Sequence, residues 1–345
     1  MIINLEQAYH KKILHSISSS VESQKNAFVN PIKTYLLEGN FEFFKNPAFL
    51  FHENQPVVIN KYGLLNDLAL VDIIQGKNWD IESQPVISQY SALVERENLP
   101  QDGLCLIGTQ WGNSNIFHLL YDSIGKITIL EKFFNIDDLT FLIPEGVENF
   151  KNILKAFNLK YLIYKTNKIY YGKFLIPSMT SYFGASSYDT VSILNKLSNR
   201  IIDSHNFDYD CIYISRKKVN TRHIINEDEL ITYLNSKMKF KLLYLEDLCF
   251  QDEISIFKNA KLIVAPHGAG LTWSIFQRAG VLIEIFSPHY VNNCFGVLLR
   301  NPDVKYHAFY SNPEIKLNYN HPEFSLKNHT IDMNNFSIFF ENIIQ

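Results

Sequence analysis

The second half of the chain alternates short apolar runs with helix-like stretches, and this pattern constrains the fold more than any other feature. Such alternation is typical of βαβ units, in which right-handed crossovers place successive strands parallel in one sheet. The pattern therefore predicts a Rossmann-type α/β sheet. The expected strands are Cys211–Ser215, Lys241–Leu245, Leu262–Ala265 and Val281–Phe286.

Helix-like stretches separate these apolar runs. Asn226 followed by Glu229 three residues later is typical of a capped helix start. Gln251–Asn259 has helical spacing, and Leu271–Ala279 lies between two expected strands. Each crossover in this half is thus expected to be a helix.

The first half is less regular, but it repeats the same kinds of element. A helix is expected over Asn115–Lys126, and a second over Tyr188–Asp203, after a polar linker at Pro177–Ser187. A chain of 345 residues exceeds the usual single-domain range. We expect two domains, residues 1–185 and 186–345. The expected strands of the first half are Leu104–Ile107, Leu139–Ile143, Lys160–Tyr164 and Ile169–Ile176.

Charge and cysteine usage exclude several classes of function. The formal net charge is −3 with no block of Lys or Arg, so nucleic acid is not an expected partner. The four cysteines form no CxxC pair and have no neighbouring histidine at metal-ligand spacing, which predicts neither a zinc site nor a disulfide framework. They are expected to be buried thiols in a reducing compartment. The cysteines are Cys105, Cys211, Cys249 and Cys294.

Targeting signals are not evident in the sequence. Residues 1–20 intersperse charged and His residues among apolar ones, unlike a signal peptide, and no apolar run elsewhere reaches the roughly 18 to 20 residues of a membrane span. We expect a cytoplasmic protein, with peripheral attachment to the inner face of the cell membrane left open.

Three expected strands deliver polar residues to one edge of the second-half sheet. Arg216 follows the first strand, the loop His267–Gly270 follows the third, and Glu284 lies near the end of the fourth. Ligands of open parallel sheets bind at the carboxyl ends of the strands. The glycine loop leads into a helix near Leu271, whose N-terminus favours an anion, and Arg216 adds a fork of donors for phosphate. Glu284 is expected to accept hydrogen bonds from sugar or ribose hydroxyls.

Each of these signals has a simpler reading. A Gly-x-Gly after a strand can be a tight turn, and a strand-end arginine can be a surface ion-pair partner. His267 can be a satisfied turn histidine, and Glu284 can be a paired buried carboxylate. The three together favour a nucleoside diphosphate-sugar more than any one does alone.

A second chemical pair lies in the first half. On the expected helix Asn115–Lys126, His118 and Asp122 are spaced i, i+4 and so share a face. A carboxylate in that position orients and polarises an imidazole, as a general base requires. The spacing fits a purely structural, hydrogen-bonded histidine equally well.

The segment Asp208–Tyr209–Asp210 has the DxD form that metal-dependent glycosyltransferases use to hold a cation against a diphosphate. It precedes the expected strand Cys211–Ser215 rather than following one. That order places it at the opposite edge of the sheet from the glycine loop. No metal site is therefore expected here.

Several spaced motifs together resemble glycosyltransferase family 61. The similarity extends over about residues 105–310. The motifs are Asn115–Asp122, Tyr213–Arg216, Arg222–Glu227, Leu248 with Gln251, Phe257 and Ala260, Pro266–Thr272, and Glu284–Phe286. Family members often carry Asn-x-x-Phe after the last of the glycine-loop residues, where this chain has Trp273–Phe276.

The resemblance implies a GT-B-like architecture of two Rossmann-type domains facing across a cleft, with inverting, metal-independent chemistry. It implies an acceptor-side domain at 1–185 and a nucleotide-sugar-binding domain at 186–345. The implied setting is bacterial capsule, lipopolysaccharide or other surface polysaccharide synthesis. The implied donor-binding residues are Ser215, Arg216, Arg222, His267, Gly268, Ala269, Gly270, Leu271, Thr272 and Glu284.

The predicted function is transfer of a sugar from a UDP- or CMP-linked donor to a glycan or glycolipid acceptor, with no other cofactor. His118, oriented by Asp122, is the expected base, while Arg216, Arg222 and the glycine-loop amides stabilise the leaving group. The main alternative is a non-catalytic sugar-binding protein of the same fold. A nucleotide-dependent oxidoreductase is disfavoured because no G-x-G-x-x-G follows an early strand.

Overall fold

The computed structural model divides the chain into two compact units, residues 1–200 and 201–345, which are described separately. The boundary between the units, after residue 200, lies beyond the expected boundary at 185. The structure describes residues 49–53, 57–60, 63–64, 96–98, 104–108, 115–132, 134–165, 168–171, 173–177, 181–182, 185–186, 188–201, 209–292, 294–299, 301–311 and 323–344.

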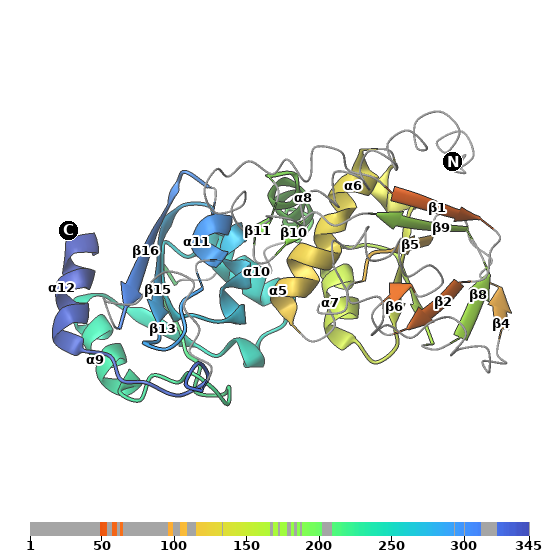
Figure 1. Cartoon of the computed structure of the whole chain (residues 1–345). Helices are drawn as coiled ribbons and strands as arrows, with labels where there is room; N and C mark the ends of the chain where they lie inside the picture. Colours follow the sequence, from red (N-terminus) through yellow and green to blue (C-terminus); the bar gives the residue numbers. More distant parts are fainter. Residues whose placement is uncertain are drawn as a thin grey trace, which may run out of the picture. The chain divides into compact units, whose positions relative to one another are not determined.

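The second unit is built on a five-stranded sheet of order β13-β12-β14-β15-β16 (Figure 1). Every pairing in it is parallel, as the alternating pattern predicts. The four expected strands are confirmed with small shifts of their ends, and a fifth follows them. The strands are β12 Cys211–Ile214, β13 Phe240–Leu243, β14 Leu262–Pro266, β15 Gly280–Phe286 and β16 Val304–Tyr310.

Helices fill the crossovers of this sheet. One expectation needs correction, because the stretch after the glycine loop is the 3₁₀ helix η9 Ala269–Phe276 rather than a helix over Leu271–Ala279. Similarly, Leu245 opens a short 3₁₀ turn instead of ending a strand. The helical elements are α9 Glu227–Lys237, η8 Leu245–Asp247, α10 Phe250–Asn259, η9, α11 Cys294–Leu298 and α12 Met333–Ile344.

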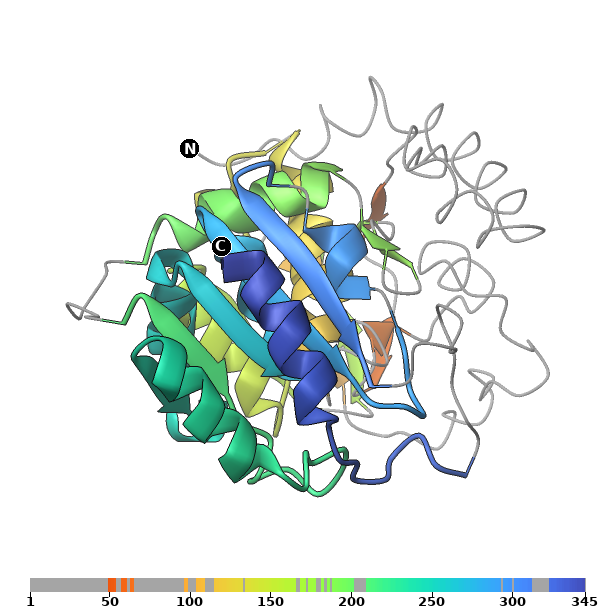
Figure 2. The same ribbon diagram turned by 90° about the vertical axis from the view of Figure 1, so that its left-hand side faces the viewer.

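One face of the sheet is covered by α9 and α12, which lie side by side in Figure 2. α10 and α11 lie on the other side of the sheet (Figure 1). Strand residues such as Tyr213, Val264 and Ile283 form one core with Phe336 and Phe340 of α12. Full burial of a large apolar side chain contributes about 1.5–3 kcal/mol, so this face stabilises the unit strongly.

The start of α9 differs from the expected cap. Asn226 is the N-cap residue, but its side chain makes no capping hydrogen bond. Its Oδ1 accepts from the Ile331 N–H at 2.9 Å, and its Nδ2 donates to the Ile331 carbonyl at 2.9 Å and to Glu229. Asn226 thus attaches the C-terminal segment to this end of the sheet instead of capping the helix.

The first unit contains a five-stranded sheet of order β1-β9-β5-β6-β7, in which only the edge strand β1 is antiparallel. Three of the expected strands are confirmed in it. The fourth, Ile169–Ile176, is divided between two sheets, as β8 and β9. The strands are β1 Phe49–Glu53, β5 Leu104–Leu106, β6 Thr140–Pro144, β7 Tyr161–Tyr164 and β9 Lys173–Pro177.

A smaller sheet of order β3-β2-β8-β4 and a two-stranded hairpin complete the strands described in this unit. The hairpin β10–β11 lies within the expected linker Pro177–Ser187. The remaining strands are β2 Val57–Asn60, β3 Gly63–Leu64, β4 Arg96–Asn98, β8 Lys168–Tyr171, β10 Ser181–Tyr182 and β11 Ala185–Ser186.

The expected helix at Asn115–Lys126 exists, but it is not a regular α-helix. It opens as α5 Ile116–His118, widens into the π-turn η5 Leu119–Ser123, tightens in η6 Ile124–Lys126 and continues as α6 Ile127–Glu131. π-turns within α-helices occur frequently at functional sites. The other helical elements are η7 Ile136–Asp138, α7 Glu148–Ala156 and α8 Tyr188–Ser198, the last ending before the expected Asp203.

The α/β class with parallel sheets is therefore confirmed. None of the helices in the described part of the chain is long and apolar enough to span a membrane. The four cysteines are free thiols, of which Cys105 is buried and Cys249 is exposed, so the expectation that all four are buried is wrong.

Candidate functional site

The carboxyl edge of the second unit's sheet brings Arg216 against the glycine loop. Arg216 follows β12, and Gly268 follows β14, which pairs with β12. A Cβ atom on Gly268 would lie 1.8 Å from Nη1 of Arg216, so any other residue here would force the guanidinium out of its present position. The φ angle of Gly268 is 171°, which any residue adopts, and glycine is needed here for space rather than for a turn.

The Arg216 side chain forms hydrogen bonds to the backbone of its own loop. Its Nε and Nη2 donate to the Thr221 carbonyl at 3.4 and 3.2 Å. Burial, followed by the nearby charge of Arg222, lowers the pKa of Arg216 to about 10, while Glu246 opposes the change. The Arg216 guanidinium therefore stays charged at neutral pH, although the negative charge of Glu246 does not fully offset burial and the neighbouring Arg222.

Arg222 is a second half-buried cation near Arg216. It has a φ of 59°, an uncommon left-handed conformation, and its backbone N–H donates to the Leu326 carbonyl at 3.1 Å. The guanidinium lies over the Tyr290 ring at 4.7 Å, and its Nε is buried with no hydrogen-bond partner among the described residues. Burial lowers the pKa of Arg222. Two half-buried arginines close together favour an anion as their partner.

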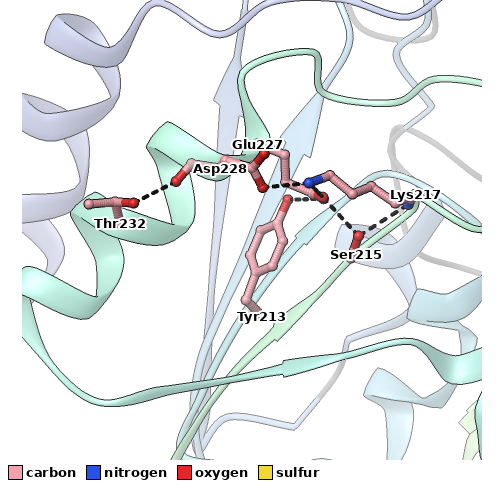
Figure 3. A network of polar contacts seen from close by, with 6 residues as sticks. All are labelled: Tyr213, Ser215, Lys217, Glu227, Asp228 and Thr232. Atoms are coloured by element: carbon pink, nitrogen blue, oxygen red, sulfur yellow. Dashed lines mark hydrogen bonds and ion pairs between the residues drawn. The ribbon is translucent and has the colours of Figure 1, made fainter.

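Ser215 has a structural role at this edge, shown in Figure 3. Its hydroxyl donates to Glu227 at 2.9 Å, as does the Tyr213 hydroxyl at 2.8 Å, and it accepts from the Lys217 N–H at 3.1 Å. Glu227 is 1% exposed at the start of α9. The carboxylate therefore fixes the loop that carries Arg216. This arrangement favours a positioning role for Ser215 over the expected direct contact with the donor.

Glu284 lies in a second buried network. Its Oε1 contacts Nδ1 of His267, and its Oε2 accepts from the Tyr306 hydroxyl. Glu284 is 0% exposed, so the expected acceptance of sugar hydroxyls is not the role that its surroundings favour. The carboxylate instead orients the His267 ring, which stacks on Phe286 with centroids 5.1 Å apart. Burial and then Glu284 raise the pKa of Tyr306.

The other glycine-loop residues divide into two groups. Ala269 and Gly270 are half-buried in the first turn of η9, where helix N–H groups have no intrahelical acceptor. Leu271 and Thr272 are 1% and 0% exposed, inside the protein. Ala269 and Gly270 are thus placed to offer backbone amides, whereas the next two residues anchor the helix.

The first unit holds the expected histidine and carboxylate pair. Nδ1 of His118 and Oδ2 of Asp122 lie 2.7 Å apart, so the predicted contact is confirmed. The His118 side chain is 29% exposed and that of Asp122 6%. Lys126, one turn further on, has its pKa lowered to about 8 by burial, with Asp122 opposing the change. The imidazole has a fixed orientation and remains accessible.

Asp210 lies at the amino end of β12, away from the glycine loop. It forms an ion pair with Lys261 at 3.0 Å, and its carbonyl accepts from the N–H groups of Lys261 and Leu262. The expected placement of this part of the DxD segment is confirmed, while Asp208 lies outside the described residues. Among the residues that the structure describes, no group of three His, Cys, Asp or Glu side chains is arranged to hold a metal ion.

Comparison with known proteins identifies a family model that spans parts of both units. Residues 116–283 match the family model Glycosyltransferase 61. The matched region begins at the His118 helix and ends within β15, so it includes Arg216, Arg222 and the glycine loop. The predicted resemblance to this family is confirmed over that region.

Relatives identified by sequence are animal glycosyltransferases, and each matches only part of this chain. The EGF domain-specific O-linked N-acetylglucosamine transferase of Drosophila melanogaster is 31% identical over 28% of this chain and 19% of its own length. Protein O-linked-mannose β-1,4-N-acetylglucosaminyltransferase 2 is 36% identical in Xenopus tropicalis and 35% in Homo sapiens, over 21% and 22% of this chain and 13% of each relative. The chain thus spans less than a fifth of the length of these relatives.

Sequence reasoning missed four residues at this edge: Glu227, His289, Tyr290 and His329. His289 and Tyr290 follow β15, and the rule that selected Arg216 and His267 also selects them. Only its burial, which the structure shows, separates Glu227 from the other acidic residues at the start of α9. His329 lies beyond the last strand, and no local pattern marks it.

Proposed function

We propose that the chain is a glycosyltransferase that moves a sugar from a nucleotide-sugar donor to a glycan acceptor. The observation that carries the proposal is the contact of Gly268 with the Arg216 guanidinium, next to half-buried Arg222, at the carboxyl edge of a parallel sheet. This arrangement suits a diphosphate. The match to the Glycosyltransferase 61 family and the names of the relatives support sugar transfer as the reaction.

The donor in this proposal is a UDP- or CMP-linked sugar, and no further cofactor is required. Its phosphates bind Arg216, Arg222 and the amides at Ala269 and Gly270, with His267 held beside them by Glu284. Positive groups at this point stabilise the charge that develops on the departing nucleotide. Metal independence is part of the proposal and is supported by the location of Asp210 at the far edge.

The chemical step in this proposal is a single inverting displacement. The acceptor oxygen forms a bond to the anomeric carbon while the bond from that carbon to the phosphate oxygen breaks. His118 takes the acceptor proton on Nε2, because Nδ1 is engaged with Asp122. This step requires a GT-B-like arrangement in which an acceptor-side domain, 1–185, faces a donor domain, 186–345.

The acceptor class distinguishes two versions of the proposal. The resemblance to bacterial family members favours a surface glycan or glycolipid of a capsule or lipopolysaccharide, made by a cytoplasmic enzyme at the inner face of the membrane. The names of the relatives instead specify EGF domains and protein-linked mannose as acceptors of those enzymes. We propose the first version for this chain.

A thermal-shift screen of nucleotides and nucleotide sugars tests donor binding. A ligand present at 100 times its dissociation constant stabilises a protein by about 2.7 kcal/mol, which a melting curve resolves. Sugar transfer is then measured with glycolipid acceptors and with O-mannosyl peptides in parallel. Stabilisation without hydrolysis or transfer would favour the alternative, a non-catalytic nucleotide-sugar-binding protein. No stabilisation by any nucleotide would refute both.

A further inference from the structure

His329 is a buried side chain whose polar atoms lack partners. It is 5% exposed, and neither Nδ1 nor Nε2 has a hydrogen-bond partner among the described residues. An unpaired buried polar group lowers stability, so a histidine in this state calls for an explanation. Contact of the His329 ring with a bound ligand would be such an explanation.

The backbone places His329 next to the loop that carries the two arginines. The His329 N–H donates to the His223 carbonyl at 2.9 Å, and the Ile225 N–H donates to the His329 carbonyl at 2.8 Å. Three residues earlier, Leu326 accepts from the Arg222 N–H. The C-terminal segment Leu326–Ile331 therefore pairs with residues 222–225 along its length and delivers His329 to the arginine side of the sheet.

The charged and titratable groups that face His329 are basic. His289 comes from the turn after β15, and Arg222 and Arg216 come from the loop after β12. Burial, followed by these three groups, lowers the pKa of His329 to about 4. Glu246 acts on Arg216, and Tyr290 lies under Arg222. In the protein without ligand, His329 is thus a neutral ring among cations.

We propose that His329 is a further donor-binding residue, which gives a ring N–H to the anion held by Arg216 and Arg222. This inference rests on the proposed function and extends it to a residue outside the matched family region, 116–283. A diphosphate oxygen is the partner that the surrounding charges favour, since it satisfies the unpaired Arg222 Nε and a His329 ring nitrogen together.

Binding of an anion also changes the protonation of this ring. The negative charge of the ligand offsets the neighbouring arginines and removes the main electrostatic obstacle to an imidazolium. The pKa of His329 therefore rises when the ligand binds, and the affinity for a diphosphate increases as the pH falls toward the pKa of the bound state.

The test uses the full chain with UDP, CMP and inorganic pyrophosphate as probes, measured by calorimetry. His329→Ala should weaken UDP and pyrophosphate binding by about tenfold or more, the effect of losing a hydrogen bond to a charged group. His329→Gln keeps an N–H donor and should lose less at neutral pH. His307→Gln is the matched control, because His307 lies in the middle of β16, and it should bind as the wild type does.

NMR titration of the His329 ring in the wild type, with and without UDP, gives a readout that does not depend on variants that fold. A rise of about one pH unit or more in its pKa on binding is expected. Binding by the wild type with no change in His329→Ala, or with no rise in this pKa, overturns the inference and leaves the proposed function standing. Failure of the wild type to bind any of the three probes overturns both.

Discussion

The carboxyl edge of the second unit's sheet and the His118 helix of the first unit differ in how their charged groups are buried. We call that edge the donor edge because we propose that the donor binds there. At the donor edge, Glu227 and Glu284 are fully engaged inside the protein, and they position neighbours rather than meet solvent. The two arginines there are half-buried, and burial lowers the pKa of each. On the His118 helix the carboxylate is buried but the imidazole is 29% exposed.

Under the proposed function, this difference assigns anion binding to the first region and proton transfer to the second. A rigid, positively charged edge can hold an anion without moving, whereas an accessible ring with a fixed tautomer can exchange a proton with a substrate. Substitutions in the two regions should therefore change different kinetic constants. The following predictions test that separation, beginning with the largest expected effect.

His118→Ala should lower the turnover rate by about 10²- to 10⁴-fold, the usual contribution of a positioned proton acceptor, and leave nucleotide affinity unchanged. Asp122→Asn should cause a smaller loss of the same kind, because the ring keeps its place but loses a charged partner. Single-turnover transfer and nucleotide binding on both variants measure the effect. Weakened nucleotide affinity in His118→Ala would remove the distinction between the two regions.

Arg216→Ala should weaken nucleoside diphosphate binding by about 1.5–3 kcal/mol, the range for a charged hydrogen bond. Gly268→Ala should have a similar effect, because its Cβ displaces the guanidinium at 1.8 Å. Gly146→Ala is a control in open space, although its φ of 77° adds strain that lowers stability alone. Calorimetry with UDP measures the affinity of each variant. An affinity of Arg216→Ala equal to that of the wild type would show that the arginine does not contact the phosphate.

The folding stability of the second unit should decrease in mild acid through His329. Burial lowers the pKa of His329 from its ordinary value of 6.5 to about 4. Between these two pH values the ring is protonated in the unfolded chain and neutral in the folded chain. The free energy of unfolding is therefore unaffected by His329 above pH 6.5 and decreases as the pH falls from 6.5 toward about 4. One proton corresponds to about 1.4 kcal/mol per pH unit.

Chemical denaturation between about pH 4 and pH 7 measures this dependence. His329→Gln should have a shallower slope than the wild type by up to that amount, and His307→Gln provides the comparison for loss of a histidine elsewhere. Identical slopes in wild type and His329→Gln would show that His329 does not titrate differently on folding.

The smallest effect is expected at Asp210. Asp210→Ala removes an exposed ion pair with Lys261, which contributes about 0–1 kcal/mol to stability, and transfer should be unchanged. EDTA should also leave transfer unchanged. Loss of turnover in EDTA that manganese or magnesium restores would contradict the metal-independent step and reassign the donor phosphates to a cation.

Local patterns predict the repeated elements but not their irregularities. Four of the five strands in the second unit's sheet were predictable because buried parallel strands are continuous apolar runs. The π-turn at Leu119–Ser123 and the 3₁₀ helix η9 were not, since each depends on how the backbone meets its surroundings rather than on residue preference. The split of Ile169–Ile176 into two strands likewise reflects pairing with different sheets.

The sequence by itself determined that several strand-end residues reach the carboxyl edge, because the ends of buried parallel strands follow from hydrophobic patterning. Arg216 and Gly268 were identified in this way, and so was the spacing of His118 and Asp122. Only the tertiary structure decided which of the edge residues face a ligand and which are enclosed. Glu284 and Ser215 are occupied by buried partners, and His329 arrives from the C-terminal segment, because burial and charge depend on contacts between residues far apart in the chain.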